Sequence, residues 1–387
     1  MRTLHKNKRM QLLTINVIVF IAFVFILELT LRNYAPITTY HLDVSSEIAR
    51  QVGWGPQLSK SGGFLCDNSH DKSSKEKKSI LTIGDSMLAC NPVQGFPFKD
   101  SIPGKLGKNL GDKFEVFNLA AGGWGTDQQL LAYKHYKKNN AFDLVLLFYT
   151  PANDLFNNSS NKAIGQNLRK PYYNLVNGDL EYNFFNNNEP NSLQKIIINS
   201  EIGKRYLGLL GKPIFETLTF KEVDIRSSSK YEHERFSHMA ANITPMLPRY
   251  ADSWKITKKI IKLLDEEVVS NGAQFAIIYL PTGIRNLLEP TETYPTNCIG
   301  YKSDEKDIVL SHHGKQIIVN PYHQYNLMKD FAEKNNIVLI DGFIDKFHPY
   351  YDSHTKLAPD CIHYNKDSYA ISIIEKEVAE YVRGLNI

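Results

Sequence analysis

The sequence is poor in cysteine and has no excess charge outside its N-terminus. Its 387 residues include only four cysteines, Cys66, Cys90, Cys298 and Cys361, and no C-x-x-C spacing indicates a zinc or thiol-redox site. Lys and Arg number 45 against 41 Asp and Glu, but residues 1–32 hold five basic and one acidic residue, which leaves 40 of each in the remainder. A neutral body without a basic run interleaved with aromatics excludes the electrostatic footprint of a nucleic-acid-binding protein.

The chain also lacks internal repeats and long low-complexity tracts, and it has one long apolar run. Leu12–Leu31 follows a basic tip and is about as long as the ~20 residues that a helix needs to cross a bilayer. The run exceeds the hydrophobic region of a usual signal peptide, and no Ala-x-Ala-like cleavage site follows it. These features favour an uncleaved anchor over a cleaved signal peptide or a buried core helix.

The basic tip is expected to stay in the cytoplasm, because positive charge favours the inner side of a membrane. In a bacterium, the rest of the chain would then be periplasmic or extracellular. The four cysteines would lie in an oxidising space, where two disulfides are possible and three pairings are open. The predicted divisions are a cytoplasmic tip (1–10), a transmembrane signal anchor (11–32), a juxtamembrane linker (33–78) and a main domain (79–387).

The main domain alternates short apolar runs with amphipathic segments. Unbroken apolar runs are typical of strands covered on both faces of a parallel sheet, and apolar residues at helical spacing indicate helices packed over it. The pattern therefore predicts an α/β fold with a central parallel sheet and helices on both faces. Strands are predicted at Ile80–Ile83, Phe114–Leu119, Leu144–Tyr149, Phe275–Leu280 and Ile337–Ile340, and helices at Asp127–Asn139, Ser253–Val269, Tyr322–Glu333 and Ser368–Arg383.

Residues 157–250 interrupt this alternation and are predicted to be an insertion. Tyr172–Val176 and Leu180–Phe184 flank Asn177-Gly178-Asp179, which is a strong hairpin signal. The insertion contains several aromatic side chains. They would either stack on sugar rings near the active site or form a small core for the insertion itself. These aromatics are Tyr172, Tyr173, Tyr182, Phe184 and Phe185.

A serine stands at the end of the first predicted strand. Gly84-Asp85-Ser86 occupies the place where open α/β sheets put reactive groups, before a predicted helix. A serine nucleophile needs a base and a third group that orients the base. Asp360 and His363 offer both near the C-terminus, and an offset of three residues brings a carboxylate beside an imidazole in a turn. The other histidines, including the pair at 312 and 313, have no convincing set of metal ligands beside them.

An ester-cleaving serine also needs donors for the oxyanion. Gly123 can present its backbone N–H closely because it has no Cβ, and Asn153 carries a side-chain amide just after the third strand. With the N–H of Ser86, these residues make a candidate oxyanion hole. Gly122 is the adjacent alternative to Gly123. Taken singly, each of these motifs is more typical of an ordinary turn than of an active site.

The four motifs together, in this order, resemble the SGNH (GDSL) hydrolase family, particularly its membrane-anchored bacterial members. The resemblance rests on G-D-S after the first strand, N-x-x-x-x-G after the second, N-D after the third and D-x-x-H before the last helix. It covers residues 79–156 and 337–387 well and the middle less well. It implies a flavodoxin-like three-layer α/β/α sandwich. Its site residues would be Ser86 as nucleophile, Gly123 and Asn153 in the oxyanion hole, Asp360 as orienting acid and His363 as base.

The resemblance implies acyl transfer through a Ser86 acyl-enzyme without a metal or organic cofactor. The expected activity is removal of O-acetyl groups from an envelope or exported polysaccharide. Three alternatives stay open: a glycan O-acyltransferase with the same residues, a lipid esterase or lysophospholipase, and a non-catalytic glycan-binding scaffold. Expected partners are an acylated carbohydrate or lipid substrate, the membrane, and polysaccharide-assembly proteins, with no nucleic acid.

Overall fold

The chain divides into two compact units, residues 1–40 with 186–223 and residues 41–185 with 224–387. The computed structural model describes residues 2–34, 77–89, 98–158, 160–161, 170–183, 242–282, 284–285, 298–299, 307–312, 315–358, 363–365, 369–385 and 387. The predicted linker and most of the predicted insertion lie outside these residues. The described part of the first unit is one helix, and all other described elements belong to the second.

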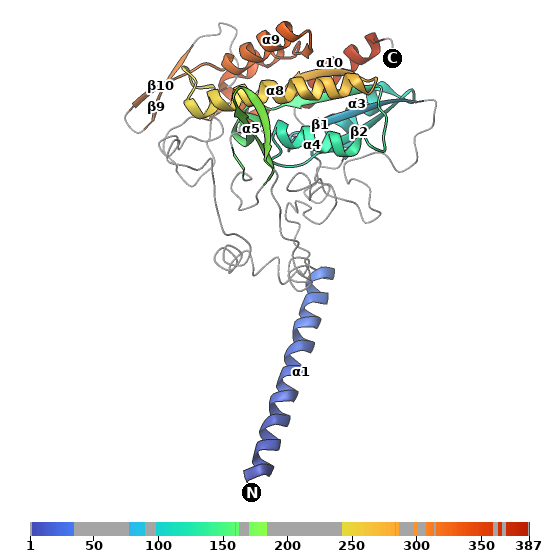
Figure 1. Ribbon diagram of the computed structural model, residues 1–387, viewed down its shortest axis with the longest axis vertical. Coiled ribbons are helices and arrows are strands. Elements are labelled where there is room, and N and C mark those ends of the chain that lie inside the picture. The colour runs from blue at the N-terminus through green and yellow to red at the C-terminus, as the bar shows by residue number, and fades with distance from the viewer. Residues whose placement is uncertain are drawn as a thin grey trace. The chain divides into compact units, whose positions relative to one another are not determined.

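The helix of the first unit, α1, spans Arg2–Tyr34 (Figure 1). Its segment Thr14–Leu31 is long and apolar enough to cross a membrane. A signal sequence near an N-terminus can also be long and apolar enough to meet this criterion. The helix is therefore suited to be either a membrane anchor or a signal sequence.

The second unit is built on a parallel sheet of five strands in the order β11-β6-β3-β1-β2. Numbered along the chain, this order is 2-1-3-4-5, the flavodoxin-like order of doubly wound folds. All four neighbouring pairs are parallel. The predicted fold class is thus confirmed. The strands are β1 (Lys78–Gly84), β2 (Phe114–Ala120), β3 (Leu144–Tyr149), β6 (Gln274–Tyr279) and β11 (Val338–Ile340).

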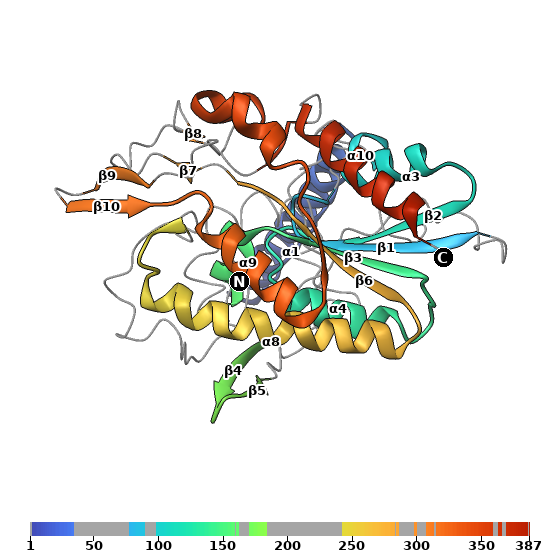
Figure 2. The ribbon, with the colours of Figure 1, turned by 90° about the horizontal axis from the view of Figure 1, so that it is seen from above.

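Helices cover both faces of this sheet (Figure 2). On one face, α3 (Ile102–Leu110) and α10 (Tyr369–Gly384) pack against each other. On the other face, α8 (Pro248–Ser270) packs against α4 (Thr126–Tyr136) and α5 (Pro151–Asn158). Helix α9 (His323–Asn335) also packs against α8, through an edge-to-face contact between the rings of Trp254 and Phe331. The three layers follow from central strands that are apolar on both sides, because each face must be covered.

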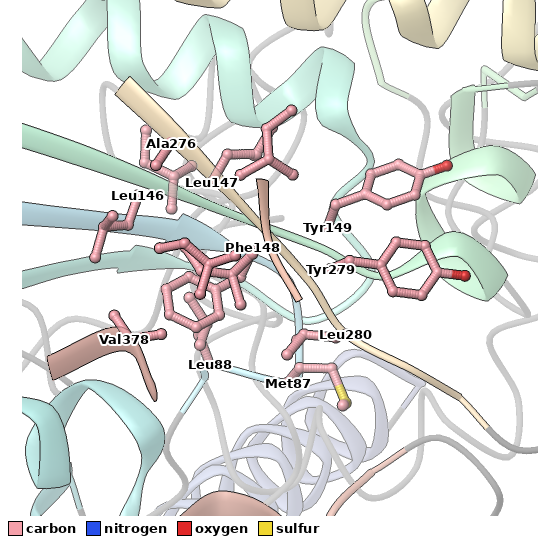
Figure 3. Close-up of a cluster of buried hydrophobic side chains, with 14 of the residues drawn as sticks. Met87, Leu88, Leu146, Leu147, Phe148, Tyr149, Ala276, Tyr279, Leu280 and Val378 are labelled. Carbon is pink, nitrogen blue, oxygen red and sulfur yellow. The ribbon is translucent and has the colours of Figure 1, made fainter. Parts of the chain in front are cut away.

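The core is densest around β3, whose six residues are all buried. Figure 3 shows Phe148 beside Leu88 and Val378, and Tyr149 beside Tyr279 of the neighbouring strand. At the end of β1, a Cβ on Gly84 would lie 2.8 Å from Leu88 Cδ1. A side chain at position 84 would therefore displace the Leu88 side chain from its place in the core.

A hairpin lies outside the three layers and matches its prediction. Strands β4 (Tyr172–Val176) and β5 (Asp179–Asn183) pair antiparallel around Asn177 and Gly178, whose φ angles are 52° and 92°. Positive φ at both central residues is the type I′ geometry that Asn-Gly favours.

The hairpin contacts α4 and α8 and contributes to the packing of the helical layer. Tyr172 and Tyr173 are 7% and 6% exposed, so they serve this packing and are not available to stack on a sugar. Tyr182 is half-exposed and lies against the Tyr173 ring. Phe184 and Phe185 lie outside the described residues.

Several short elements were not predicted from the sequence. They lie between the main strands or lead into the main helices. They are the hairpin strands β9 (Ile308–His312) and β10 (Lys315–Val319), the two-residue strands β7 (Ile284–Arg285) and β8 (Cys298–Ile299), and the 3₁₀ segments η2 (Phe98–Asp100) and η5 (Asp345–Lys356).

Candidate active site

The candidate residues gather at the carboxyl ends of β1, β2 and β3. Ser86 lies just after β1, Gly123 just after β2, and Asn153 just after β3. In the sheet, β2 lies on one side of β1 and β3 lies on the other, so the chain changes direction across the sheet after β2. Such a reversal of strand order opens a crevice at the carboxyl edge, where doubly wound folds bind ligands.

A tight turn holds Ser86. The Met87 N–H donates to the Asp85 carboxylate at 2.9 Å, and the Ala89 N–H donates to the Asp85 carbonyl at 3.1 Å. The second of these bonds spans four residues, as in one turn of α-helix. The predicted helix after Ser86 is described here only as this turn, because residues 90–97 lie outside the described part of the chain.

Asn118 of β2 fastens this turn to the sheet, and the sequence analysis assigned it no role. Its side-chain N–H donates to the Leu88 carbonyl at 3.0 Å, and its Oδ1 accepts from the Thr82 hydroxyl at 3.0 Å. Asn118 is 2% exposed. Because the Asn118 side chain is buried and hydrogen-bonded to both the serine turn and β1, it fixes the position of this turn relative to the sheet.

Ser86 and His363 meet although they are 277 positions apart, with 2.7 Å between Ser86 Oγ and His363 Nε2. The residue after the histidine anchors it, because the Tyr364 hydroxyl donates to the Pro281 carbonyl at 2.5 Å and the Tyr364 ring is buried. The Asn365 N–H donates to the Leu357 carbonyl at 2.8 Å. The histidine segment is therefore attached to the end of β6, close to the serine turn.

Asp360, the predicted orienting acid, lies outside the described residues, and its role stays a prediction. Cys66, Cys90 and Cys361 also lie outside them, as does the side chain of Cys298. The predicted disulfides therefore stay predictions as well.

Asn153 lies in the first turn of α5 and is 6% exposed. Its side-chain N–H donates to the Trp124 carbonyl at 2.7 Å, and its Oδ1 accepts from the side-chain N–H of Asn157 at 2.8 Å. The amide is thus fixed directly against the Trp124–Gly125 peptide, one residue after Gly123. These two bonds use one of its two N–H groups and leave the second directed elsewhere in the site.

Gly123 has a φ of 73°, in the left-handed region that favours glycine. Gly122 is not among the glycines with positive φ. Within the described residues, the backbone N–H groups of Ser86 and Gly123 donate to no protein acceptor. This geometry makes Gly123, more than Gly122, the residue whose conformation requires glycine.

A buried carboxyl, that of Asp85, lies directly behind the serine. Burial raises the pKa of Asp85 to about 6. The Met87 N–H and the charge of His363 oppose this rise, as do the side chains of Thr150 and Asn153, which interact with the carboxyl. The Asp85 carboxyl thus lies among groups of the candidate site. It ionises less readily than an exposed carboxyl because it is shielded from water.

Asp154, one residue after Asn153, is a second buried carboxyl. Burial and the neighbouring charge of Asp85 hold the pKa of Asp154 well above its usual range. Asp154 accepts from the Thr150 N–H at 2.7 Å and from the Gln129 amide at 3.0 Å. The site therefore contains two acids that resist ionisation.

A second cluster of buried polar side chains, Lys170, Asp127 and Asn158, lies at the C-terminal end of α5. Lys170 and Asp127 form an ion pair with exposures of 0% and 1%. Asn158 Oδ1 accepts from the Asp127 N–H at 3.2 Å, and its side-chain N–H donates to the Thr257 hydroxyl at 2.7 Å. This network joins α4, α5 and α8, so it holds the helix that carries Asn153. In the described part of the chain, no three His, Cys, Asp or Glu side chains converge as metal ligands.

No protein-family model and no curated protein matches the chain. Solved structures do resemble it loosely. A protein described as a carbohydrate acetylesterase family member from Sinorhizobium meliloti has 12% identity and a TM-score of 0.34, with 79% of this chain and 98% of that one covered. The lipase/acylhydrolase from Enterococcus faecalis has 11% identity and a TM-score of 0.36, with coverage of 79% and 96%.

Another similar structure, described as an acetyl xylan esterase, has 11% identity and a TM-score of 0.36, with 79% of this chain and all of that one covered. The names of these three proteins refer to esterases and an acylhydrolase. Likenesses at these identities and TM-scores carry no argument about activity. The functional inference therefore rests on the residues of this chain.

Proposed function

We propose that this protein is a serine esterase of the SGNH type, which works through an acyl-enzyme on Ser86. The observation that carries the proposal is the 2.7 Å contact between Ser86 Oγ and His363 Nε2 at the carboxyl edge of the sheet. A serine hydroxyl in contact with an imidazole is the minimal pair for nucleophilic acyl transfer. The adjacent donors supply the other requirement of this chemistry.

In the first half of the reaction, His363 removes the Ser86 proton while Oγ attacks the ester carbonyl carbon. The carbonyl oxygen becomes an anion, and its proposed donors are the N–H groups of Ser86 and Gly123 and the second side-chain N–H of Asn153. The alcohol leaves with the proton from His363. Removing one such donor from an enzyme lowers kcat by roughly 100- to 1,000-fold.

In the second half, water attacks the acyl-enzyme. His363 takes a proton from this water, and the carboxylic acid leaves as Ser86 recovers its proton. Asp360 is proposed to accept a hydrogen bond from the other ring nitrogen of His363, which would keep Nε2 facing Ser86. None of these steps involves a metal or an organic cofactor.

The proposed substrate is an O-acetylated envelope or exported polysaccharide. The support is α1, whose length and composition suit an anchor that would hold the enzyme at a membrane surface. With a basic N-terminal tip in the cytoplasm, the catalytic unit would be periplasmic or extracellular. Polysaccharide-assembly proteins would be its neighbours there.

The test is the hydrolysis of p-nitrophenyl acetate by the full chain in detergent, compared with Ser86→Ala. We expect the substitution to lower kcat at least about 1,000-fold, because no other group can form the acyl-enzyme. Ser79→Ala is the matched control. It removes a hydroxyl at the opposite end of β1, where Ser79 bonds to Asp143. A folded Ser86→Ala protein that hydrolyses at the wild-type rate would contradict the proposal.

The same assay with a long-chain ester and a glycan acceptor separates the substrate classes. Preference for acetate and release of free acetate support the polysaccharide esterase. A preference for long chains would indicate a lipid esterase, and serine-dependent transfer to the glycan would indicate an acyltransferase. Either result would overturn the proposed substrate while leaving the Ser86 chemistry in place.

A further inference from the structure

Asn157 lies one helical turn beyond Asn153 on the same side of α5. Residues four apart on an α-helix are neighbours, so a side-chain bond between them needs no other element. The side chains of Asn153 and Asn157 make this bond at 2.8 Å. Nothing in the local sequence indicates it, because Asn157 stands at the start of an Asn-rich run that is typical of a loop. We infer that Asn157 is a positioning residue, which fixes the side-chain amide of Asn153 with its N–H groups toward the oxyanion. The inference rests on the proposed function.

The orientation of the Asn153 amide follows from what its neighbours can do. The Trp124 carbonyl can only accept a hydrogen bond, so the Asn153 atom 2.7 Å from it is nitrogen. Asn153 Oδ1 then faces the opposite way, toward Asn157, which donates to it. The two bonds are mutually consistent in one orientation of the amide only. If the amide turned over, Oδ1 would face the Trp124 carbonyl oxygen.

The pair is closed to water. Asn157 has no measurable exposure, and Asn153 is 6% exposed. Water therefore cannot replace the Asn157 N–H, as it does for exposed amides. Within the described residues, Asn157 Oδ1 is itself buried without a partner. Because a buried unpaired oxygen costs stability, the contribution of Asn157 lies in its donor and not in its acceptor.

The Asn157 N–H determines which atoms of the Asn153 amide face the proposed oxyanion site. With Oδ1 held by Asn157, the second N–H of the Asn153 amide is left on the side of the Asp85 carboxyl, with which the Asn153 side chain interacts, and where the oxyanion is proposed to form. With the amide reversed, an oxygen would face the developing oxyanion, and two acceptors repel each other. Asn157 therefore acts on the transition state through Asn153 and touches no substrate atom.

The test is Asn157→Asp, an isosteric change from donor to acceptor. The control is Asn335→Asp in α9, a helix that carries no proposed site residue. The Asn335 side-chain N–H donates to the Phe331 carbonyl at 2.8 Å, so the change also removes a donor to a group four residues earlier in a helix. At pH 8 we expect Asn157→Asp to lower kcat about 10- to 100-fold with KM within about threefold, as expected for a lost oxyanion donor. We expect kcat of Asn335→Asp to stay within about threefold of wild type.

The pH profile gives a readout that a loss of packing would not produce. In the Asn157→Asp protein, the protonated form of the introduced carboxyl can again donate to Asn153 Oδ1, and burial favours that form. The ratio of kcat between Asn157→Asp and the wild type should therefore rise as the pH is lowered from about 8 to about 5.5. Asn157→Ala is the second variant if the introduced carboxyl destabilises the fold, with an expected loss of about tenfold in kcat.

A measurement independent of turnover separates this inference from the proposed function. In protein labelled with ¹⁵N-asparagine, the side-chain NH₂ resonance of Asn153 should move in Asn157→Asp and stay in place in Asn335→Asp. An unchanged resonance, or folded Asn157→Asp and Asn157→Ala proteins with kcat within about threefold of wild type, would overturn the inference. If wild type and Ser86→Ala hydrolyse esters equally, the proposed function fails, and the resonance still decides whether Asn157 fixes the amide.

Discussion

The two helical layers over the sheet are built differently. The side chains that α3 and α10 bury are apolar except for Glu375, which is 7% exposed and accepts from the Asn109 amide at 2.8 Å. The layer of α4, α5 and α8 has an ion pair and several amides in its interior, including Lys170, Asp127 and Asn158. The layer of α3 and α10 is stabilised mainly by the burial of apolar side chains, which is non-directional. The layer of α4, α5 and α8 is stabilised in addition by hydrogen bonds and an ion pair, which fix the distances between its helices.

The difference follows the position of the candidate site. Helix α5 carries Asn153 and belongs to the polar layer, while the apolar layer contributes none of the predicted site residues within the described part of the chain. A hydrophobic contact tolerates small shifts between helices, whereas an amide that must meet an oxyanion does not. We conclude that both layers support stability and that the polar layer also fixes the geometry of the candidate site.

The largest expected effect in the polar layer comes from Lys170→Met. It leaves the Asp127 carboxylate buried without its partner, which should lower the free energy of unfolding by about 3–5 kcal/mol. Urea denaturation of the full chain in detergent measures the change. Lys170→Met combined with Asp127→Asn removes both charges and should recover most of the loss. If the single and double variants were equally unstable, the charge would not be the cause.

A smaller effect is expected in the apolar layer from Leu106→Ala. Leu106 is fully buried in α3, and its truncation should cost about 3 kcal/mol of stability by leaving a cavity. The kcat of the folded protein should stay unchanged, because α3 bears no proposed site residue. Val269→Ala at an exposed position of α8 is the control, with an expected change below about 0.5 kcal/mol. A large fall in kcat for folded Leu106→Ala would break the division between the layers.

The smallest expected effect is a pH-dependent one from Asp85→Asn. The folded pKa of Asp85, about 6, lies above its ordinary value of 3.8, so the folded state loses stability as the pH rises through about 6. Asparagine does not ionise and avoids this loss. Asp85→Asn should therefore be more stable than the wild type by on the order of 2 kcal/mol at about pH 7.5, and the difference should vanish near pH 4. Urea denaturation at both pH values tests the sign, and a difference that grows toward the lower pH would contradict it.

The sequence was sufficient to predict the layers of the fold. The five core strands are predicted because each is an apolar run bounded by a turn, and the observed β3 has the predicted bounds Leu144–Tyr149. The Asn177-Gly178 turn was predicted because few residue pairs accept positive φ twice. Strands β7 and β8 have two residues each, which is too short for the apolar-polar alternation of a strand to be recognised in the sequence.

The candidate site was predictable where its chemistry is local. Ser86 and Gly123 follow strands, and their motifs stand out in the sequence. Helix α5 was missed because Asn157 and Asn158 begin an Asn-rich run that is typical of a loop. Pro151 at the first helical position, with Asp154 in the first turn, was the available signal. The bond between Lys170 and Asp127 joins residues 43 positions apart and has no local signal at all.

The distance along the chain between Ser86 and His363 also has a consequence for biosynthesis. A ribosome that has made the serine turn must still add 277 residues before the base exists. Until then, the nascent chain carries a serine hydroxyl with no group to activate it. A product that ends before His363 is therefore expected to lack the serine–histidine pair on which the proposed hydrolysis depends.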